Sequence, residues 1–402
     1  MTSTENTRQR RRYQGIDLLT ILVLLGSAVF SVMLFFFRRY GAEINDCFFS
    51  VNDRWMDFLN PLSYAEGRWI FRDAYANSPP FLAFFSWAIG HLSSFAGITR
   101  ETAYLVCWFI FVMIQMVTAV ILCNKKIIPA IVMATSFPMW YCFDRGNMVF
   151  IVAALISIFL IAYEHKRYTL AAVIIGIAAS FKIYPAILGA VLLADKKWKA
   201  AGVCVITAVV CTVIPLLAFH DGFAEAIRIW IERTQTYASV GNGILEWLHD
   251  DKSSLNQLIL IPKVLSGEIQ TIEDVPTGIG LWKAALMILM GICGIWSCFA
   301  KRNHDRILML SLLMIGFPIE SGVYNLVLIL IPMVYWCVKE KEAVFVPIAG
   351  AFLISCESFW MFSSDPHITW QAIIHPVCIV VLMAYLFILR GRERAAALRR
   401  NS

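Results

Sequence analysis

Runs of about twenty apolar residues recur from one end of this 402-residue chain to the other. A run of that length spans the hydrocarbon core of a bilayer when it forms an α-helix. The chain is 59% hydrophobic and only 15% charged, whereas about a quarter of the residues in a soluble domain carry a charge. Closed β-barrels are excluded, because their strands would read as segments of about ten residues with alternating polarity. The sequence therefore predicts an all-α, polytopic helical membrane protein.

The basic residues lie in short clusters at the ends of these runs. The positive-inside rule accounts for such clusters, so the net charge of +6 is no sign of nucleic-acid binding. The polar, basic segment 1–16 precedes the first run, and no small-residue cleavage site follows that run, so we expect an uncleaved first helix. We predict one integral membrane domain over 1–402 in the cell membrane, with both tails, 1–16 and 391–402, in the cytoplasm.

The stretch 81–97 (FLAFFSWAIGHLSSFAG) could be a second span or a helix along the membrane interface. Only the interfacial placement leaves every later basic cluster on the cytoplasmic side. The stretch is also short for a span, and it contains His91 and several serines. We therefore predict an outer loop at 38–101 with juxtamembrane helices, and a second outer loop at 220–277 that has an amphipathic portion.

This placement predicts about twelve transmembrane helices. The least regular pair lies on either side of Lys182 and Pro185, which interrupt one apolar run. Broken backbone at membrane depth is tolerated only where it lines a cavity, so we expect Lys182 at the outer end of a pocket. The predicted spans are 17–37, 102–124, 127–143, 148–163, 168–182, 185–195, 200–219, 278–300, 306–320, 323–338, 343–363 and 369–390.

Eleven cysteines are scattered singly, without the spacing of a metal site. Most lie inside apolar runs, which indicates packing. Only Cys47 falls in a polar loop, and a disulfide there has no evident partner.

Ionisable groups at the membrane edge are costly, so each is a functional candidate. Carboxylates and cations on one face suit a reaction in which a base activates a hydroxyl while cations hold a departing anion. No phosphate-binding glycine loop, GxSxG elbow or HExxH helix is present. The topology places these candidates on the outer side: Asp57, Asp144, Arg145, Asn147, Lys182, Tyr184, Glu320, Tyr324, Asn325 and His367.

Structural roles are open for each candidate. Asp57 could be solvated or cap a helix, and Asp144 with Arg145 could form a salt bridge at a helix end. Lys182 could extend to the interface from a helix end. Glu320 and His367 fit structural roles, and the aromatic residues at span ends fit an aromatic belt.

Four ordered segments resemble polyprenyl-phosphate-sugar-dependent glycosyltransferases of the GT-C fold, and most closely glycosyltransferase family 87. The resemblance covers roughly residues 15–340 and includes a "DF-N-L-Y... YPPL" opening, an "ERGN" segment, an "LKIYP" segment and a late "YNL... IP" segment. Two departures are Asp144 in place of glutamate and Ser78 in place of tyrosine. The matching stretches are Met56–Ala65 with Asn77–Leu82, Phe143–Asn147, Ala178–Pro185, and Tyr324–Leu326 with Ile331-Pro332.

The resemblance implies that Asp57 is the catalytic base, with Asp53 and Asp46 as substitutes if the register differs. Lys182, with Arg145 or Arg68, would then stabilise the leaving phosphate. It also implies a polyprenyl-phosphate sugar donor, mannose-like, a glycan or glycolipid acceptor, and an inverting transfer beside membrane lipid. No metal or cofactor is expected, because a monophosphate leaving group needs less charge neutralisation than a pyrophosphate, although Asp53 and Asp57 could supply carboxylates to a cation. The remaining predicted substrate-binding residues are Asp144, Asn147, Tyr184, Tyr324 and Asn325.

Two other functions remain open. A transporter or flippase of a lipid-linked glycan would also use broken helices, but it usually has matching interrupted segments in two halves. A polymerase or ligase of wall polysaccharide predicts catalytic Arg or His in a large late loop, whereas the loop near His367 is small. Consumption of a polyprenyl-phosphate sugar would distinguish a transferase from a transporter.

Overall fold

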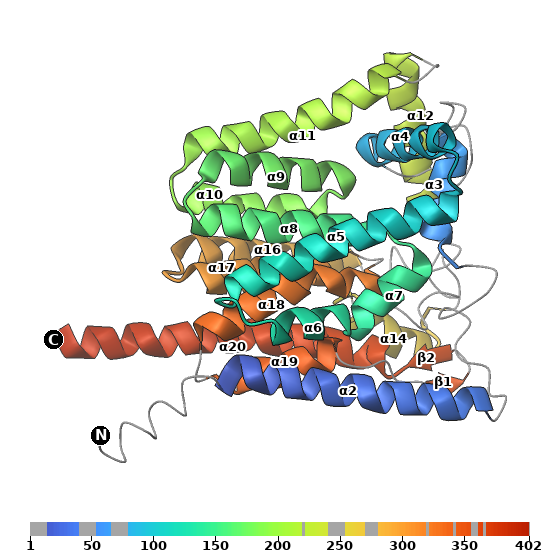
Figure 1. Ribbon diagram of the computed structural model, residues 1–402. Coiled ribbons are helices and arrows are strands. Elements are labelled where there is room, and N and C mark those ends of the chain that lie inside the picture. The colour runs from blue at the N-terminus through green and yellow to red at the C-terminus, as the bar shows by residue number, and fades with distance from the viewer. Residues whose placement is uncertain are drawn as a thin grey trace. The chain divides into compact units, whose positions relative to one another are not determined.

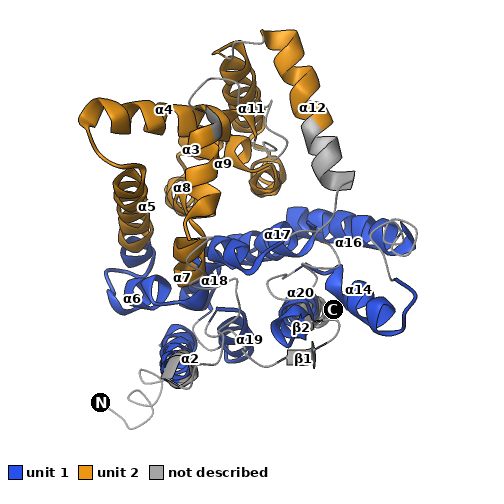
Figure 2. Ribbon diagram, turned by 90° about the vertical axis from the view of Figure 1, so that its right-hand side faces the viewer, with its two compact units in different colours: residues 1–45, 119–138, 247–402 blue, residues 46–118, 139–246 orange. Residues whose placement is uncertain are grey.

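The computed structural model is almost entirely helical and divides into two compact units (Figures 1 and 2). Unit 1 comprises residues 1–45, 119–138 and 247–402, and unit 2 comprises 46–118 and 139–246. Each unit is therefore assembled from segments that are far apart in the sequence. The structure describes residues 14–39, 54–65, 79–218, 222–239, 254–269, 280–318, 321–340, 343–354, 361–364 and 367–401.

Unit 1 has its core in two consecutive helices that are buried on all sides. Every residue from Asp305 to Gly316 of α17 (Asn303–Gly316) is buried, as is every residue from Val327 to Cys337 of α18 (Val327–Lys339). Such all-round apolar faces belong to a helix surrounded by other helices. The other elements of unit 1 are α2 (Gln14–Arg39), α6 (Ile128–Ala134), α14 (Gln257–Leu265), α16 (Gly280–Phe299), η4 (Val323–Leu326), α19 (Phe345–Ile354), β1 (Met361–Ser364), β2 (His367–Thr369) and α20 (Gln371–Asn401).

Unit 2 is organised around α8 (Val149–Glu164), which is buried along most of its length, and α9 (Tyr168–Phe181). Helix α9 packs on both α8 and α11 (Trp198–Ala218). A Cβ at Gly176 would lie only 2.7 Å from the carbonyl oxygen of Cys204, so glycine permits the close approach of α9 to α11. The other elements are α3 (Met56–Ala65), α4 (Pro80–Ala96), α5 (Arg100–Leu122), α7 (Phe137–Arg145), η2 (Tyr184–Gly189), α10 (Ala190–Ala194) and α12 (Phe223–Ser239), with residues 119–122 of α5 and 137–138 of α7 in unit 1.

Most predicted spans correspond to observed helices, with bounds that differ by a few residues. Four helices are long and apolar enough to cross a membrane: Arg100–Leu122, Trp198–Ala218, Gly280–Phe299 and Gln371–Leu389. Several shorter apolar helices accompany them, such as Val149–Glu164 and Val323–Lys339. The helical membrane architecture follows from these elements, whereas the count of about twelve spans stays a prediction.

Two of the stretches predicted as single spans are not continuous helices in the structure. The stretch 127–143 is divided into α6 and α7 by Thr135 and Ser136, and Pro138 follows at the start of α7. Proline is tolerated in the first turn of a helix, where its missing N–H would have no partner within the helix, so Pro138 is compatible with the start of α7. In the described part of the stretch 343–363, α19 covers Phe345–Ile354, and residues 361–364 form strand β1, which pairs with β2 in an antiparallel arrangement.

The predicted break at Lys182 is present. Lys182 has extended backbone (φ −149°, ψ 134°) directly after α9, and the chain continues as a 3-10 helix, η2, and then as α10. The two predicted pieces 168–182 and 185–195 therefore exist as separate elements.

The predicted loop 38–101 contains the two helices α3 and α4 in its described part. Helix α4 has 17 residues and is not one of the four helices long enough to cross a membrane. Figure 2 shows α4 running crosswise to α5, which is seen nearly end-on. The placement of α4 in the membrane interface stays a prediction.

Candidate active site

Asp57 is the second residue of α3, and its carboxylate is held by two side chains from the turn between α7 and α8. The amide nitrogen Nδ2 of Asn147 donates a hydrogen bond to Asp57 Oδ2 at 2.8 Å. Arg145 Nη2 lies 3.5 Å from the other carboxylate oxygen, Oδ1. The side chains of Asp57 and Arg145 are 28% and 19% exposed, so the pair is shielded on most sides yet open to a substrate.

The side chain of Asn147 is itself fixed by the start of α8. Its Oδ1 accepts a hydrogen bond from the backbone N–H of Val149 at 3.1 Å, which satisfies one of the unpaired donors of the helix N-terminus. The backbone N–H and carbonyl of Asn147 are also engaged, by the carbonyl and the thiol of Cys142 respectively. The amide that faces Asp57 is therefore pre-oriented.

A close backbone contact brings α3 to this turn. The N–H of Trp55 donates to the carbonyl of Asp144 at 2.9 Å, and the carbonyl of Trp55 begins α3 by accepting from Phe58 and Leu59. Trp55 has φ +61°, an uncommon conformation for a bulky residue, and Gly146 has φ +70°. A Cβ on Gly146 would lie 2.7 Å from the Trp55 α-carbon, so only glycine fits there without a shift.

Aromatic side chains surround this contact. The ring of Trp55 lies 5.2 Å from that of Tyr104 and 5.8 Å from that of Phe143, and Phe58 lies 5.0 Å from Tyr104. The hydroxyl of Tyr104 donates to the Phe143 carbonyl at 2.6 Å. The guanidinium of Arg54 covers the Trp55 ring at 4.5 Å. The first turn of α3 thus rests on a rigid apolar base.

Lys182 and Tyr184 lie in the same neighbourhood of unit 2. The buried thiol of Cys142 is within electrostatic reach of both Asp57 and Lys182, and Tyr184 is within reach of Cys142. Lys182 and Tyr184 are half-buried. Asp57 and Arg145 therefore meet beside the turn that joins α7 to α8, and Lys182 lies near Cys142 of α7.

The end of α9 is tied to the loop helix α4. Phe181, which precedes Lys182, meets the rings of Phe81 and Phe85 edge-on, with centroid separations of 5.0 and 5.3 Å. Helix α4 also packs against α3. The same helix therefore contacts both the element that carries Asp57 and the helix end that precedes Lys182.

Three further predicted substrate-binding residues are described with other contacts, and their role in substrate binding stays a prediction. Asp144 is buried, and its backbone carbonyl holds Trp55. Tyr324 and Asn325 lie in η4 of unit 1, where the Tyr324 ring covers Gly322 and the buried Asn325 side chain faces Ser321 at 3.5 Å. Arg68, together with Asp46, Asp53 and Glu320, lies outside the described residues.

Sequence reasoning missed Trp55 and Tyr104 as parts of the site, and it included Gly146 only as a member of the Asp144–Asn147 segment. The glycine in the Asp144–Asn147 segment was the available signal, because a glycine between polar residues after a helix favours a left-handed turn. The close approach of Trp55 to it has no local signature.

The sequence of residues 75–319, more than half of the chain, matches the family model of glycosyltransferase family 87. The chain belongs to glycosyltransferase family 87. This enzyme is therefore a membrane glycosyltransferase that acts on a sugar donor and an acceptor. The match includes the Asp144–Asn147 turn and the Lys182–Tyr184 break, but it begins after Asp57 and ends before Tyr324. No curated protein matches the sequence.

Proposed function

We propose that this family 87 glycosyltransferase moves one sugar, mannose-like, from a polyprenyl-phosphate donor to a glycan or lipid acceptor at the outer face of the cell membrane. The carboxylate of Asp57, oriented by Asn147 and paired with Arg145, supports this proposal most directly. A partly exposed carboxylate paired with a cation suits base catalysis with an anionic leaving group.

The reaction is an inverting displacement at the anomeric carbon. The acceptor hydroxyl transfers its proton to Asp57 while its oxygen forms a bond to the anomeric carbon. The bond between that carbon and the phosphate oxygen breaks on the opposite side, and the polyprenyl phosphate departs with the electron pair. Proton, charge and leaving group are thereby accounted for without a further reactant.

Arg145 and Lys182 have the charge to stabilise the departing phosphate. A guanidinium can hold phosphate oxygens through two parallel hydrogen bonds, and a lysine acts as a point charge. Arg145 is 3.5 Å from Asp57, a loose ion pair that a phosphate can replace without unfolding either element. Loss of Arg145 from the pair would also leave Asp57 a better proton acceptor once the donor is bound.

The isolated enzyme in detergent tests this function. It should be incubated with a panel of polyprenyl-phosphate sugars and a lipid-linked glycan acceptor, and donor consumption and the product anomer should be measured. We expect one donor to be consumed and the product to have the opposite anomeric configuration. No consumption of any such donor would overturn the proposed donor class.

The variant Asp57→Asn tests the base. It keeps the size and a hydrogen-bonding side chain but removes the proton acceptor, so we expect turnover to fall by about 10² to 10⁴ with donor binding retained. Asp195→Asn is the matched control, because Asp195 bonds to Tyr163 near the end of α10 and has no place in the mechanism. Full activity of Asp57→Asn would exclude this residue as the base.

A further inference from the structure

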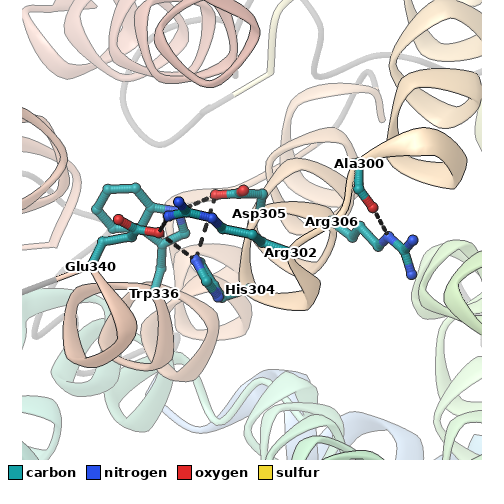
Figure 3. A network of polar contacts seen from close by, with 7 residues as sticks. All are labelled: Ala300, Arg302, His304, Asp305, Arg306, Trp336 and Glu340. Carbon is teal, nitrogen blue, oxygen red and sulfur yellow. Dashed lines mark hydrogen bonds and ion pairs between the residues drawn. The ribbon is translucent and has the colours of Figure 1, made fainter. Parts of the chain in front are cut away.

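A second polar cluster lies in unit 1, where the first turn of α17 meets the end of α18 (Figure 3). The Nε2 atom of His304 is 2.8 Å from Glu340 Oε1 and 3.9 Å from Asp305 Oδ1. One donor atom from each of the three side chains lies within 4.8 Å of the other two. Within the part of the chain that the structure describes, this is the one group of three such residues close enough to share a metal ion.

The cluster is shielded from solvent, and a hydrogen bond from Trp336 holds one of its carboxylates. Asp305 is fully buried, and the side chains of His304 and Glu340 are 12% and 19% exposed. The indole N–H of Trp336 donates to Asp305 Oδ1 at 2.8 Å. A hydrogen bond of this kind fixes the orientation of a carboxylate that binds a metal ion.

The two arginines near the cluster, Arg302 and Arg306, make different contacts. Arg302 pairs with Glu340, but its side chain is 42% exposed. Arg306 turns away from the cluster in Figure 3, and its Nε donates to the carbonyl of Ala300 at 2.5 Å. Two carboxylates at such burial need a cation, and Arg302 is the one that can move into solvent.

We propose that His304, Asp305 and Glu340 bind a divalent transition-metal ion of the Zn²⁺ type, which competes with Arg302 for Glu340. Zn²⁺ binds imidazole nitrogen and carboxylate oxygen at about 2.0–2.2 Å, so in a tetrahedral site two of its ligand atoms are about 3.4 Å apart. The separations of 2.8 Å for His304–Glu340 and 3.9 Å for His304–Asp305 lie on either side of this value. The atoms of Asp305 and Glu340 lie within 4.8 Å of each other, so binding requires these two carboxylates to approach.

Binding displaces a proton as well as the guanidinium. The Nε2 atom of His304 now shares a hydrogen bond with Glu340, whereas a metal-bound Nε2 carries no proton. The metal would link the start of α17 to the end of α18 inside unit 1, and it takes no part in the proposed sugar transfer.

Direct Zn²⁺ binding tests the site independently of activity. The full-length enzyme, purified in detergent through an affinity tag without histidine, should be titrated with Zn²⁺ by calorimetry, with bound metal measured after dialysis. We expect one equivalent of Zn²⁺, and we expect His304→Ala and the isosteric Glu340→Gln to weaken binding at least about tenfold. His165→Ala is the matched control, because His165 is an exposed histidine at the end of α8 in unit 2.

Arg302→Gln separates the metal site from a purely ionic network. Removal of the competing guanidinium should tighten Zn²⁺ binding, whereas a network without a metal gives no binding in any variant. Thermal unfolding of each variant in detergent should accompany the titration, so that a binding loss is scored only on folded protein. The proposal is overturned if the wild-type enzyme retains no Zn²⁺, if Glu340→Gln binds it unchanged, or if Arg302→Gln binds it more weakly.

Discussion

A Cβ on Gly146 would lie 2.7 Å from the α-carbon of Trp55, closer than real Cβ atoms come to such a neighbour. Both residues have left-handed backbone, and the contact sets the start of α3 against the turn before α8. Asp57 follows Trp55 by two residues, and Asn147 follows Gly146 directly. The backbone contact therefore positions the two side chains that meet at 2.8 Å.

Gly146→Ala should damage the site severely. Left-handed backbone costs a non-glycine residue about 1–2 kcal/mol, and the clash with Trp55 adds to this. Gly97→Ala is a matched control, because Gly97 has φ +67° but a Cβ added to it would meet no atom within 4 Å. We expect Gly146→Ala to lower both the unfolding temperature and donor turnover well beyond Gly97→Ala. Equal effects of the two substitutions would show that the approach to Trp55 has no consequence.

Asn147→Ala should lower turnover more than donor affinity. A hydrogen bond to a charged group contributes about 1.5–3 kcal/mol, which corresponds to a loss of about 10- to 100-fold in turnover if Asn147 orients the base. Asn147→Asp keeps the acceptor for the Val149 N–H but places a carboxylate against Asp57, so it should be at least as inactive. Steady-state kcat and KM for the donor check this. An unchanged kcat in both variants would contradict an orienting role.

Lys182→Gln should reduce turnover by about 10² to 10³, the usual cost of removing one stabilising group from a developing anion. Lys182→Arg retains the charge and should recover part of this loss. Lys197→Gln provides a comparison, because Lys197 covers the Tyr168 ring at 4.6 Å near the start of α11 and has no proposed catalytic role. If Lys182→Arg is no better than Lys182→Gln, the charge of Lys182 does not stabilise the leaving group.

Phe181→Ala should loosen α4 from the end of α9. Truncation of a buried phenylalanine typically costs about 3–5 kcal/mol, and here it removes the edge contacts with Phe81 and Phe85. The expected result is lower thermal stability together with weaker donor turnover. Phe95→Ala on the same loop helix α4 is the control, because Phe95 is 93% exposed and should change little. Retention of full turnover by Phe181→Ala would show that α4 does not help to position Lys182.

Local patterns were sufficient for most of the elements. The predicted span 102–124 corresponds to α5 at Arg100–Leu122, and 168–182 corresponds to α9 at Tyr168–Phe181. The break after α9 could be predicted, because Lys182 and Pro185 interrupt an apolar run. The break at Thr135 and Ser136 could not, because both residues are compatible with a helix and both bond to preceding helix carbonyls.

The sequence predicted several residues of the candidate site, but it did not predict the contacts that hold them in place. Asp57 and the segment that contains Arg145 and Asn147 were selected as two separate motifs, and the structure brings their side chains together. Asp144 was chosen for its charge, yet its backbone carbonyl makes the contact to Trp55. Backbone carbonyls are present in every residue, so no residue type marks such a role.

By itself the sequence determined a helical membrane protein. The length of an apolar run must match the thickness of the bilayer, and clusters of basic residues set the orientation of the spans, and both features are local in the sequence. Only the tertiary structure decided that the start of α3 meets a turn 90 residues later in the chain. That meeting depends on Gly146 and Trp55 fitting backbone to backbone, with Tyr104 and Phe143 packed around them. Close packing between distant segments arises from the whole folded arrangement, and no periodic pattern in the chain encodes it.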